Sequence, residues 1–164
     1  MAVLTGRNST RKYEGSYEMI AKAVTIFAGE DAVRQNYRLF ERVALSCKLR
    51  DGDAHLKNFG MVYDHPLAAR KLAPVYDVVC TDIYPELDGK LALKLNKSKT
   101  FPIRANLLAY GVRLGLSHSE AEKVLKRLDD AFDQVCDVLK DDQRYRDDAL
   151  LTRIKDAVYA ADQS

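Results

Sequence analysis

A crowded run of polar residues interrupts the sequence between two apolar regions, in the stretch CKLRDGDAHLKNFG from Cys47 to Gly60. Within it Asp53 and Asn58 are separated by four residues, and Asp77 follows nineteen positions after Asn58, directly behind a short apolar run. Two carboxylates and one amide are the set that phosphoryl transfer from Mg-ATP requires. One carboxylate accepts the proton of the attacking hydroxyl, and the other holds Mg²⁺ together with the amide oxygen. Because Mg²⁺ takes few protein ligands, one Asp and one Asn are sufficient as the ligands from the protein.

The same spacing occurs in the catalytic loop of protein kinases, as Asp-x-x-x-x-Asn followed by a later metal-binding Asp. The usual kinase flanks are absent here. No His-Arg precedes Asp53, and Val78 and Val79 stand where Phe-Gly would follow Asp77. A pattern this short also arises by chance, so spacing alone leaves a solvated loop with an Asn-containing turn as an equal interpretation.

A second interpretation makes part of this region a transition-metal site, because Asp-x-His spacing suits such metals. The four ligands of a metal-dependent phosphohydrolase would then be Asp51, Asp53, His55 and Asp77. A two-metal site would need a further His/Asp cluster, which the sequence lacks, because His65 precedes a proline and His118 lies in a predicted helix cap.

Composition limits the class of protein. With 164 residues, 47% of them hydrophobic and 30% charged, the chain fits one compact domain or one lobe of a larger protein. A net charge of +2 is not that of a strongly basic nucleic-acid binder, so no direct nucleic-acid binding is expected. No apolar run approaches ~18 residues and the start MAVLTGRNST is no signal peptide, which predicts a cytoplasmic protein without membrane contact. The three cysteines suit reduced core thiols.

Two helices are predicted before the polar run. Ser16 is a candidate N-cap for a helix to about Ala28, and after a turn at Gly29 the next helix begins at Glu30 or Asp31. Apolar positions at steps of three and four predict its buried face: Val33, Tyr37, Phe40, Ala44 and Cys47. Arginines at positions 34, 38 and 42 lie on another face of this helix. The second helix is thus predicted to end where the polar run begins.

The middle of the chain, from Gly60 to Leu95, changes to short β-prone pieces, with breaks at His65-Pro66, Pro85 and Asp88-Gly89. From Phe101 onward the pattern is helical again, and Ser117 with Glu120 fits a capping box. Two apolar stripes are predicted to be core: Val124, Leu125, Leu128, Phe132, Val135, Val138 and Leu139 in one helix, and Leu150, Leu151, Ile154 and Val158 in the last. The predicted fold class is mainly α, with a small β element around residues 60–95.

Four blocks together resemble a known family: RKYEG (Arg11 to Gly15), DGDAHLKNFG, LAPVYDVV (Leu72 to Val79) and KLALKLN (Lys90 to Asn96). In order and approximate spacing they are similar to the C-terminal half of the HipA-type serine/threonine kinases, toxins of bacterial toxin–antitoxin systems, and they cover most of residues 8–100. The fold that this resemblance implies is the helical C-lobe of a protein-kinase-like fold.

By this resemblance Asp53 would be the catalytic base, Asn58 a Mg²⁺ ligand and Asp77 the principal Mg²⁺ ligand, with ATP as co-substrate. His55 and Lys57 belong to the same motif. Lys57 would neutralise phosphate charge near the transferred group, and His55 is expected to brace the loop by hydrogen bonding. No catalytic role is assigned to Tyr76 or to the lysines at positions 94, 97 and 99.

The resemblance also implies a cytoplasmic protein substrate, such as an aminoacyl-tRNA synthetase, and a DNA-binding antitoxin as partner. The sequence holds no G-x-G-x-x-G loop and no Val-Ala-x-Lys strand. Residues 1–164 are therefore expected to be the C-terminal lobe of a kinase whose N-terminal, ATP-clamping lobe is absent from this chain, and the chain alone is expected to be inactive. The alternative is a non-catalytic interaction module that binds an antitoxin or a separate kinase half.

Overall fold

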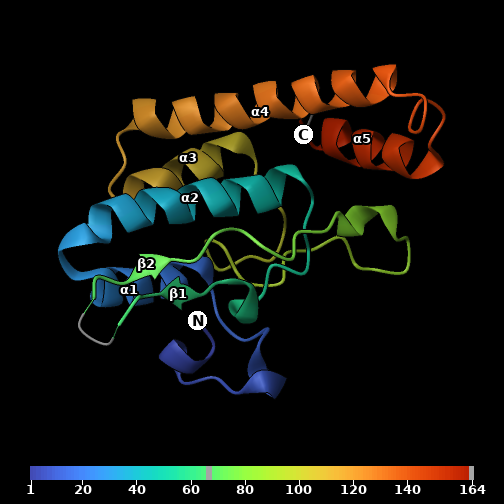
Figure 1. The fold of residues 1–164 in the computed structure, drawn as a ribbon. Helices are drawn as coiled ribbons and strands as arrows, with labels where there is room; N and C mark the ends of the chain where they lie inside the picture. Colours follow the sequence, from blue (N-terminus) through green and yellow to red (C-terminus); the bar gives the residue numbers. More distant parts are fainter. Residues whose placement is uncertain (66–67, 163–164) are drawn as a thin grey trace.

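The computed structural model describes residues 1–65 and 68–162, and its regular part consists of α-helices and one small antiparallel sheet (Figure 1). The helices are α1 (Tyr17–Ala28), α2 (Ala32–Lys48), α3 (Arg104–Arg113), α4 (His118–Asp141) and α5 (Ala149–Asp162). The strands are β1 (Met61–Val62) and β2 (Lys71–Leu72), and short 3₁₀ turns lie at Val3–Thr5, Ser9–Arg11, Gly29–Asp31, Leu56–Asn58 and Thr81–Ile83. The mainly α fold expected from the sequence is confirmed.

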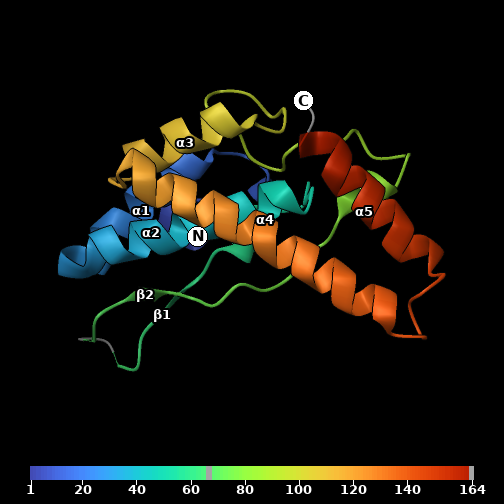
Figure 2. The same cartoon turned by 90° about the horizontal axis from the view of Figure 1, so that it is seen from above.

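Helix α2 lies at the centre of the molecule. It packs against α1 on one side and α4 on the other, and α3 packs against α4 and α2 (Figures 1 and 2). Its apolar residues Leu39, Phe40 and Val43 are completely buried, as are Tyr17 of α1 and Tyr110 of α3. The hydrophobic core therefore forms around α2, which ends where the polar run begins.

The predicted helix starts are confirmed at two caps. The hydroxyl of Ser16 accepts the backbone N–H of Met19 at 3.2 Å, and α1 ends at Ala28 before Gly29, whose φ of 58° lies in the left-handed region. Ser117 and Glu120 form a reciprocal capping box at the start of α4. The second helix begins at Ala32, because residues 29–31 form a 3₁₀ turn first.

The prediction that the apolar stripes are core is wrong at several positions. Val33 is 74% exposed, at the start of α2, and Val135 and Val138 are 55% and 64% exposed. The C-terminal half of α4 extends past α2 and α3, and α5 is the helix that lies beside it (Figure 1). An apolar side chain on the opposite face of such a helix has no layer to bury against. Leu150, in the first turn of α5, is likewise 50% exposed.

The predicted β element is smaller than its sequence suggests. In the hairpin Met61 pairs with Leu72 and Val62 with Lys71. The KLALKL segment forms no strand of its own, and its pairing is limited to isolated bridges such as Ser16 with Lys94. Pro66, at one predicted break, lies outside the described residues.

The structure bears on two expectations drawn from composition, the state of the cysteines and the absence of a membrane-spanning segment. All three cysteines are free thiols, and Cys47 and Cys136 are buried while Cys80 is partly exposed. Within the described residues, no helix has the length and apolar character needed to cross a membrane.

Candidate active site

The polar run forms a loop that is fastened to the end of α2. The backbone N–H of Asp51 donates to the carbonyl of Ser46 at 2.8 Å, and the carboxylate of Asp51 accepts the N–H of Asp53 at 3.0 Å. On the other side, the hydroxyl of Thr81 accepts the N–H of Gly52 and donates to the carbonyl of Arg50. The backbone around Asp53 is therefore held from both neighbouring segments.

Asp53 itself is partly exposed and faces the N-terminal segment. Its Oδ1 accepts the phenolic hydroxyl of Tyr13 at 2.7 Å. This hydrogen bond fixes the direction of the carboxylate. Tyr13 is a site residue to which sequence reasoning gave no role, although it lies in the RKYEG block.

Asn58 and Asp77 are brought into direct contact, although nineteen residues separate them. The Nδ2 of Asn58 donates to Oδ2 of Asp77 at 2.6 Å. Asn58 is buried in the 3₁₀ turn Leu56–Asn58, where its Oδ1 accepts the N–H of His55 at 3.1 Å. Asp77 is exposed and has a left-handed φ of 57°, which is uncommon for a residue other than glycine. Two of the three residues singled out by spacing thus form one hydrogen-bonded pair, in which only Asp77 is exposed.

Arg42 supports the segment that leads to Asp77. The sequence pattern placed Arg42 on the polar face of its helix, and this is wrong, because its side chain is only 6% exposed. Its guanidinium donates to the carbonyls of Ala73 and Pro74, which the short hairpin leaves unpaired. Burial lowers the pKa of Arg42, but the guanidinium stays charged at neutral pH.

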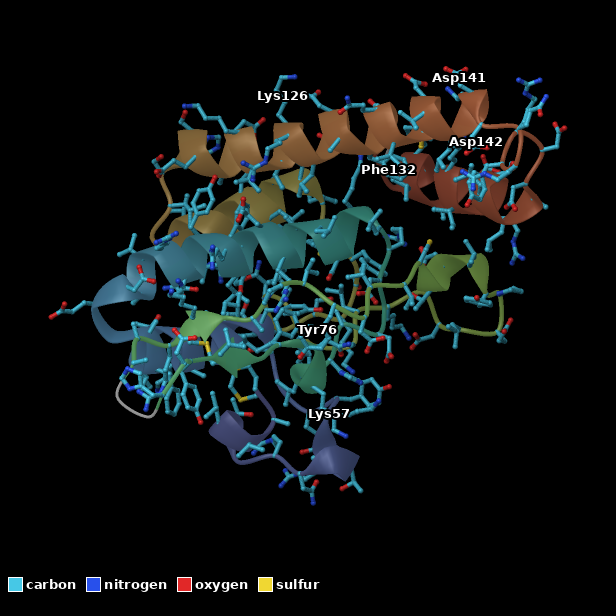
Figure 3. All side chains as sticks on the ribbon, in the orientation of Figure 1. Lys57, Tyr76, Lys126, Phe132, Asp141 and Asp142 are labelled. Atoms are coloured by element: carbon cyan, nitrogen blue, oxygen red, sulfur yellow. The ribbon has the colours of Figure 1, made fainter. Side chains whose placement is uncertain are left out.

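Tyr76 joins this segment to the polar loop that carries Asp53 and Asn58. Its hydroxyl donates to the backbone carbonyl of Lys57 at 2.6 Å, and its ring lies 5.6 Å from the guanidinium carbon of Arg42 (Figure 3). Phe59, on the loop side, lies 5.4 Å from the same guanidinium. Arg42 is therefore sandwiched between the two segments that carry Asn58 and Asp77, and no spacing rule would have identified it.

The side chain of His55 is buried below the loop. Its ring packs edge-on against Tyr13, with the ring centres 5.2 Å apart. Burial lowers the pKa of His55, so the imidazole is neutral at neutral pH. Its backbone N–H is the group that braces Asn58. Lys57, in contrast, is exposed beside the loop. The roles of both residues stay predictions.

Asp51 is a second acid in the loop, and it is 1% exposed. Burial raises its pKa to about 6, and the nearby charges of Asp53 and Asp77 act in the same direction. The N–H of Asp53 and the Ser46 hydroxyl oppose this rise by hydrogen bonding. Asp51 thus sits beneath the loop as a buried acceptor for the backbone of Asp53.

The buried Asn58 and the exposed Asp77 together offer the oxygen donors that a hard cation prefers. A cation between them requires the amide oxygen of Asn58 to face it in place of the nitrogen. Among residues 1–65 and 68–162, no three His, Cys, Asp or Glu side chains are placed to share a metal ion. The four ligands of the phosphohydrolase interpretation therefore do not form such a group.

Comparison with known proteins identifies relatives of the chain. The family described as HipA-like C-terminal domain matches residues 1–136. A putative kinase of Haemophilus influenzae is 37% identical over 83 residues, which are 49% of this chain and 23% of that protein. The putative kinase Y4mE of Sinorhizobium fredii is 35% identical over 63 residues, 38% of this chain and 14% of that protein. The chain therefore spans less than a quarter of the length of these curated relatives.

A solved structure shares the fold. It is the Shewanella oneidensis toxin–antitoxin complex of HipA, HipB and operator DNA, and it matches with a TM-score of 0.74 at 18% identity. The match covers 97% of this chain and 41% of that one. The resemblance stated from the four sequence blocks is confirmed: the chain belongs to the family of HipA-like C-terminal domains.

Proposed function

We propose that this chain is the C-terminal lobe of an ATP- and Mg²⁺-dependent serine/threonine protein kinase. The observation that carries the proposal is the 2.6 Å contact between Asn58 and Asp77, which places an amide and a carboxylate together beside the loop of Asp53. Membership of the HipA-like family supports it, because the curated relatives are named as putative kinases.

Asp53 is the proposed catalytic base. It receives the substrate hydroxyl proton and orients that hydroxyl toward the γ-phosphate. Tyr13 holds the carboxylate in one direction through its 2.7 Å hydrogen bond. His55, buried and neutral, supports the loop from below rather than taking part in proton transfer. Lys57 supplies positive charge near the transferred group.

Asn58 and Asp77 are the proposed Mg²⁺ ligands, with Asp77 contributing the charge. When bound, Mg²⁺ neutralises phosphate charge and holds ATP in place. The left-handed backbone at Asp77 and the Tyr76 hydrogen bond to Lys57 keep the two segments in register. These contacts keep the two ligands at one place before any ion arrives.

The parts that cover ATP and engage its α- and β-phosphates belong to a separate N-terminal lobe in this proposal. We also propose a protein substrate, such as an aminoacyl-tRNA synthetase, and a cytoplasmic location, which are what the resemblance to the family implies. A DNA-binding antitoxin is the proposed partner, since the structural relative is a complex with HipB and operator DNA.

A Mg²⁺ titration followed by NMR tests the metal site directly. In ¹⁵N-labelled chain, the backbone signals of Asn58 and Asp77 should shift and saturate with Mg²⁺, and Asp77→Ala should abolish the response. Asp64→Ala removes an exposed acid from the same middle segment and should leave the response intact. If Asp77→Ala titrates like the unaltered chain, the metal-site assignment is wrong.

A further inference from the structure

A basic groove lies beside the catalytic loop. It has a volume of about 970 Å³ and opens between the start of α1, the turn at residues 94–99 and the end of α3. Its charged lining consists of four cations and two acids: Lys94, Lys97, Lys99, Arg113, Glu14 and Glu18. The sequence alone gave Lys94, Lys97 and Lys99 no catalytic role.

The acids of the groove are already engaged by other groups. Glu14 pairs with Arg11 at 2.6 Å, and Glu18 accepts the backbone N–H of Asn96 at 2.9 Å. In contrast, none of the four cations makes an ion pair within the part of the chain that the structure describes. A backbone hydrogen bond leaves the charge of Glu18 in place, so the groove holds four cations against one unpaired acid and carries an excess of positive charge.

A tight turn holds the lysines in place. Leu95 and Ser98 exchange backbone hydrogen bonds of 2.8 and 3.0 Å, and the two residues between them, Asn96 and Lys97, have left-handed φ values of 51° and 69°. Two consecutive non-glycine residues in this conformation carry a conformational cost. Lys94 is fixed by the bond from the N–H of Tyr17 to its carbonyl at 3.0 Å. The basic side chains thus project from a defined backbone.

Tyr13 connects the groove to the catalytic loop. Its side chain lines the groove, and its hydroxyl donates to Asp53 at 2.7 Å. A chain lying in the groove therefore passes directly beside the proposed base. This continuity distinguishes the groove from basic patches elsewhere on the surface.

We propose that the groove binds an acidic segment of the protein substrate, whose carboxylates meet the lysines while a neighbouring serine or threonine reaches Asp53. This inference rests on the proposed kinase function and adds a substrate class to it. Complementary charge beside the acceptor hydroxyl is a common way for kinases to select substrates, through both attraction and the rejection of basic segments.

Peptide binding to this chain tests the groove without nucleotide or metal. The probe is a short fluorescent peptide with one serine flanked by glutamates, and its matched control has glutamines instead. Fluorescence anisotropy should show tighter binding of the acidic peptide, weakened by salt. Replacing the three lysines together (K94Q, K97Q, K99Q) should weaken it about tenfold, since each exposed ion pair contributes ~0.5 kcal/mol.

The control variant removes the same charge elsewhere, as K22Q, K123Q and K126Q on the exposed faces of α1 and α4. It should change the affinity less than twofold. Circular dichroism establishes that both variants fold, and R113Q alone provides a second, milder test. Equal losses in both triple variants, or equal binding of the two peptides, would overturn the proposal.

Two further outcomes separate the possible explanations. A single-stranded RNA is tested in the same assay. If it binds more tightly than the acidic peptide, and the groove variant does not bind it, the ligand of the groove is a nucleic acid and the acidic-peptide proposal is wrong. If the Mg²⁺ titration fails but selective peptide binding persists, the kinase assignment is wrong while the acidic docking groove stands. If the titration succeeds and selective peptide binding is absent, only the groove proposal fails.

Discussion

Asp51 shows how a single buried carboxyl can shape the stability of the loop that carries Asp53. Its pKa is raised to about 6 by burial, above its ordinary value of 3.8. The folded chain therefore keeps this proton over a range in which the unfolded chain has released it. The free energy of unfolding falls as the pH rises through this window and stays lower above it.

Asp51→Asn should remove this pH dependence. Asparagine keeps an oxygen that can accept the N–H of Asp53, but it never ionises. The stability advantage of the variant over the unaltered chain should grow between about pH 4 and pH 7.5, by up to ~3 kcal/mol. Urea unfolding at several pH values measures it. Asp64→Asn, at an exposed site, should show no such growth, and a constant difference for Asp51→Asn would contradict the prediction.

At the scale of elements, one buried arginine joins the Asp77 segment to α2. Arg42 donates to two carbonyls, those of Ala73 and Pro74, in a stretch where the hairpin provides no partners. These hydrogen bonds are partly buried, and one to a charged group contributes about 1.5–3 kcal/mol. Arg42→Met keeps an unbranched apolar side chain but removes the guanidinium donors.

We expect Arg42→Met to lower the free energy of unfolding by ~2 kcal/mol and to weaken Mg²⁺ binding through Asp77. Arg38→Met, at an exposed position one turn earlier on the same helix, is the matched control and should change stability by less than ~0.5 kcal/mol. Urea unfolding and the Mg²⁺ titration provide the two measurements. Similar small effects of both substitutions would show that Arg42 does not hold the segment.

The packing of α3 depends on Gly111. A Cβ added there would lie 2.9 Å from the Cβ of Ala121 on α4 and 3.0 Å from the ring of Phe40 on α2. Gly111→Ala should therefore destabilise the chain by about 1–3 kcal/mol, despite the better helix propensity of alanine. Thermal unfolding measures the change. In the control Gly60→Ala the new Cβ meets its neighbours at an ordinary 3.5 Å, so a loss as large as that of Gly111→Ala would contradict the packing argument.

The periodicity of apolar residues predicted the helices correctly where interactions between residues close in sequence determine them. The caps at Ser16 and Ser117 and the buried apolar positions Phe40, Ala44 and Cys47 of α2 are set by neighbours in the sequence, and the structure confirms them. The exposure of Val135 and Val138 depends on how far α4 extends beyond its partners. That extension is a feature of the tertiary structure, and no pattern among neighbouring residues in the sequence indicates it.

The candidate site likewise contains residues that the sequence pattern predicted and residues that it missed. Spacing singled out Asn58 and Asp77, and the structure brings them together. It did not single out Tyr13, Tyr76 or Arg42, because their roles come from contacts across 19 to 40 residues of sequence. Aromatic and arginine side chains occur throughout this chain, so their types alone could not reveal these contacts.

At the scale of the whole molecule, the proposed kinase function gives this chain one side of a phosphoryl-transfer site. Asp77 is exposed and Asp53 is partly exposed, while Asn58 is buried beside Asp77, and the sequence holds no glycine-rich loop to cover ATP. Without groups on the α- and β-phosphates, the γ-phosphate is not positioned for attack, and positioning supplies much of the catalysis of phosphoryl transfer.

The 164-residue chain should therefore transfer no measurable phosphate from [γ-³²P]ATP to protein. A longer protein that joins it to an ATP-clamping lobe should do so, and should lose this activity with Asp53→Asn while keeping its fold and its Mg²⁺ response. Transfer by the chain alone that Asp53→Ala abolishes would contradict the requirement for a second lobe. If Asp53→Asn in the longer protein leaves the biological effect intact, the chain acts by binding an antitoxin or another partner, and its acidic loop is a structural element rather than a catalytic one.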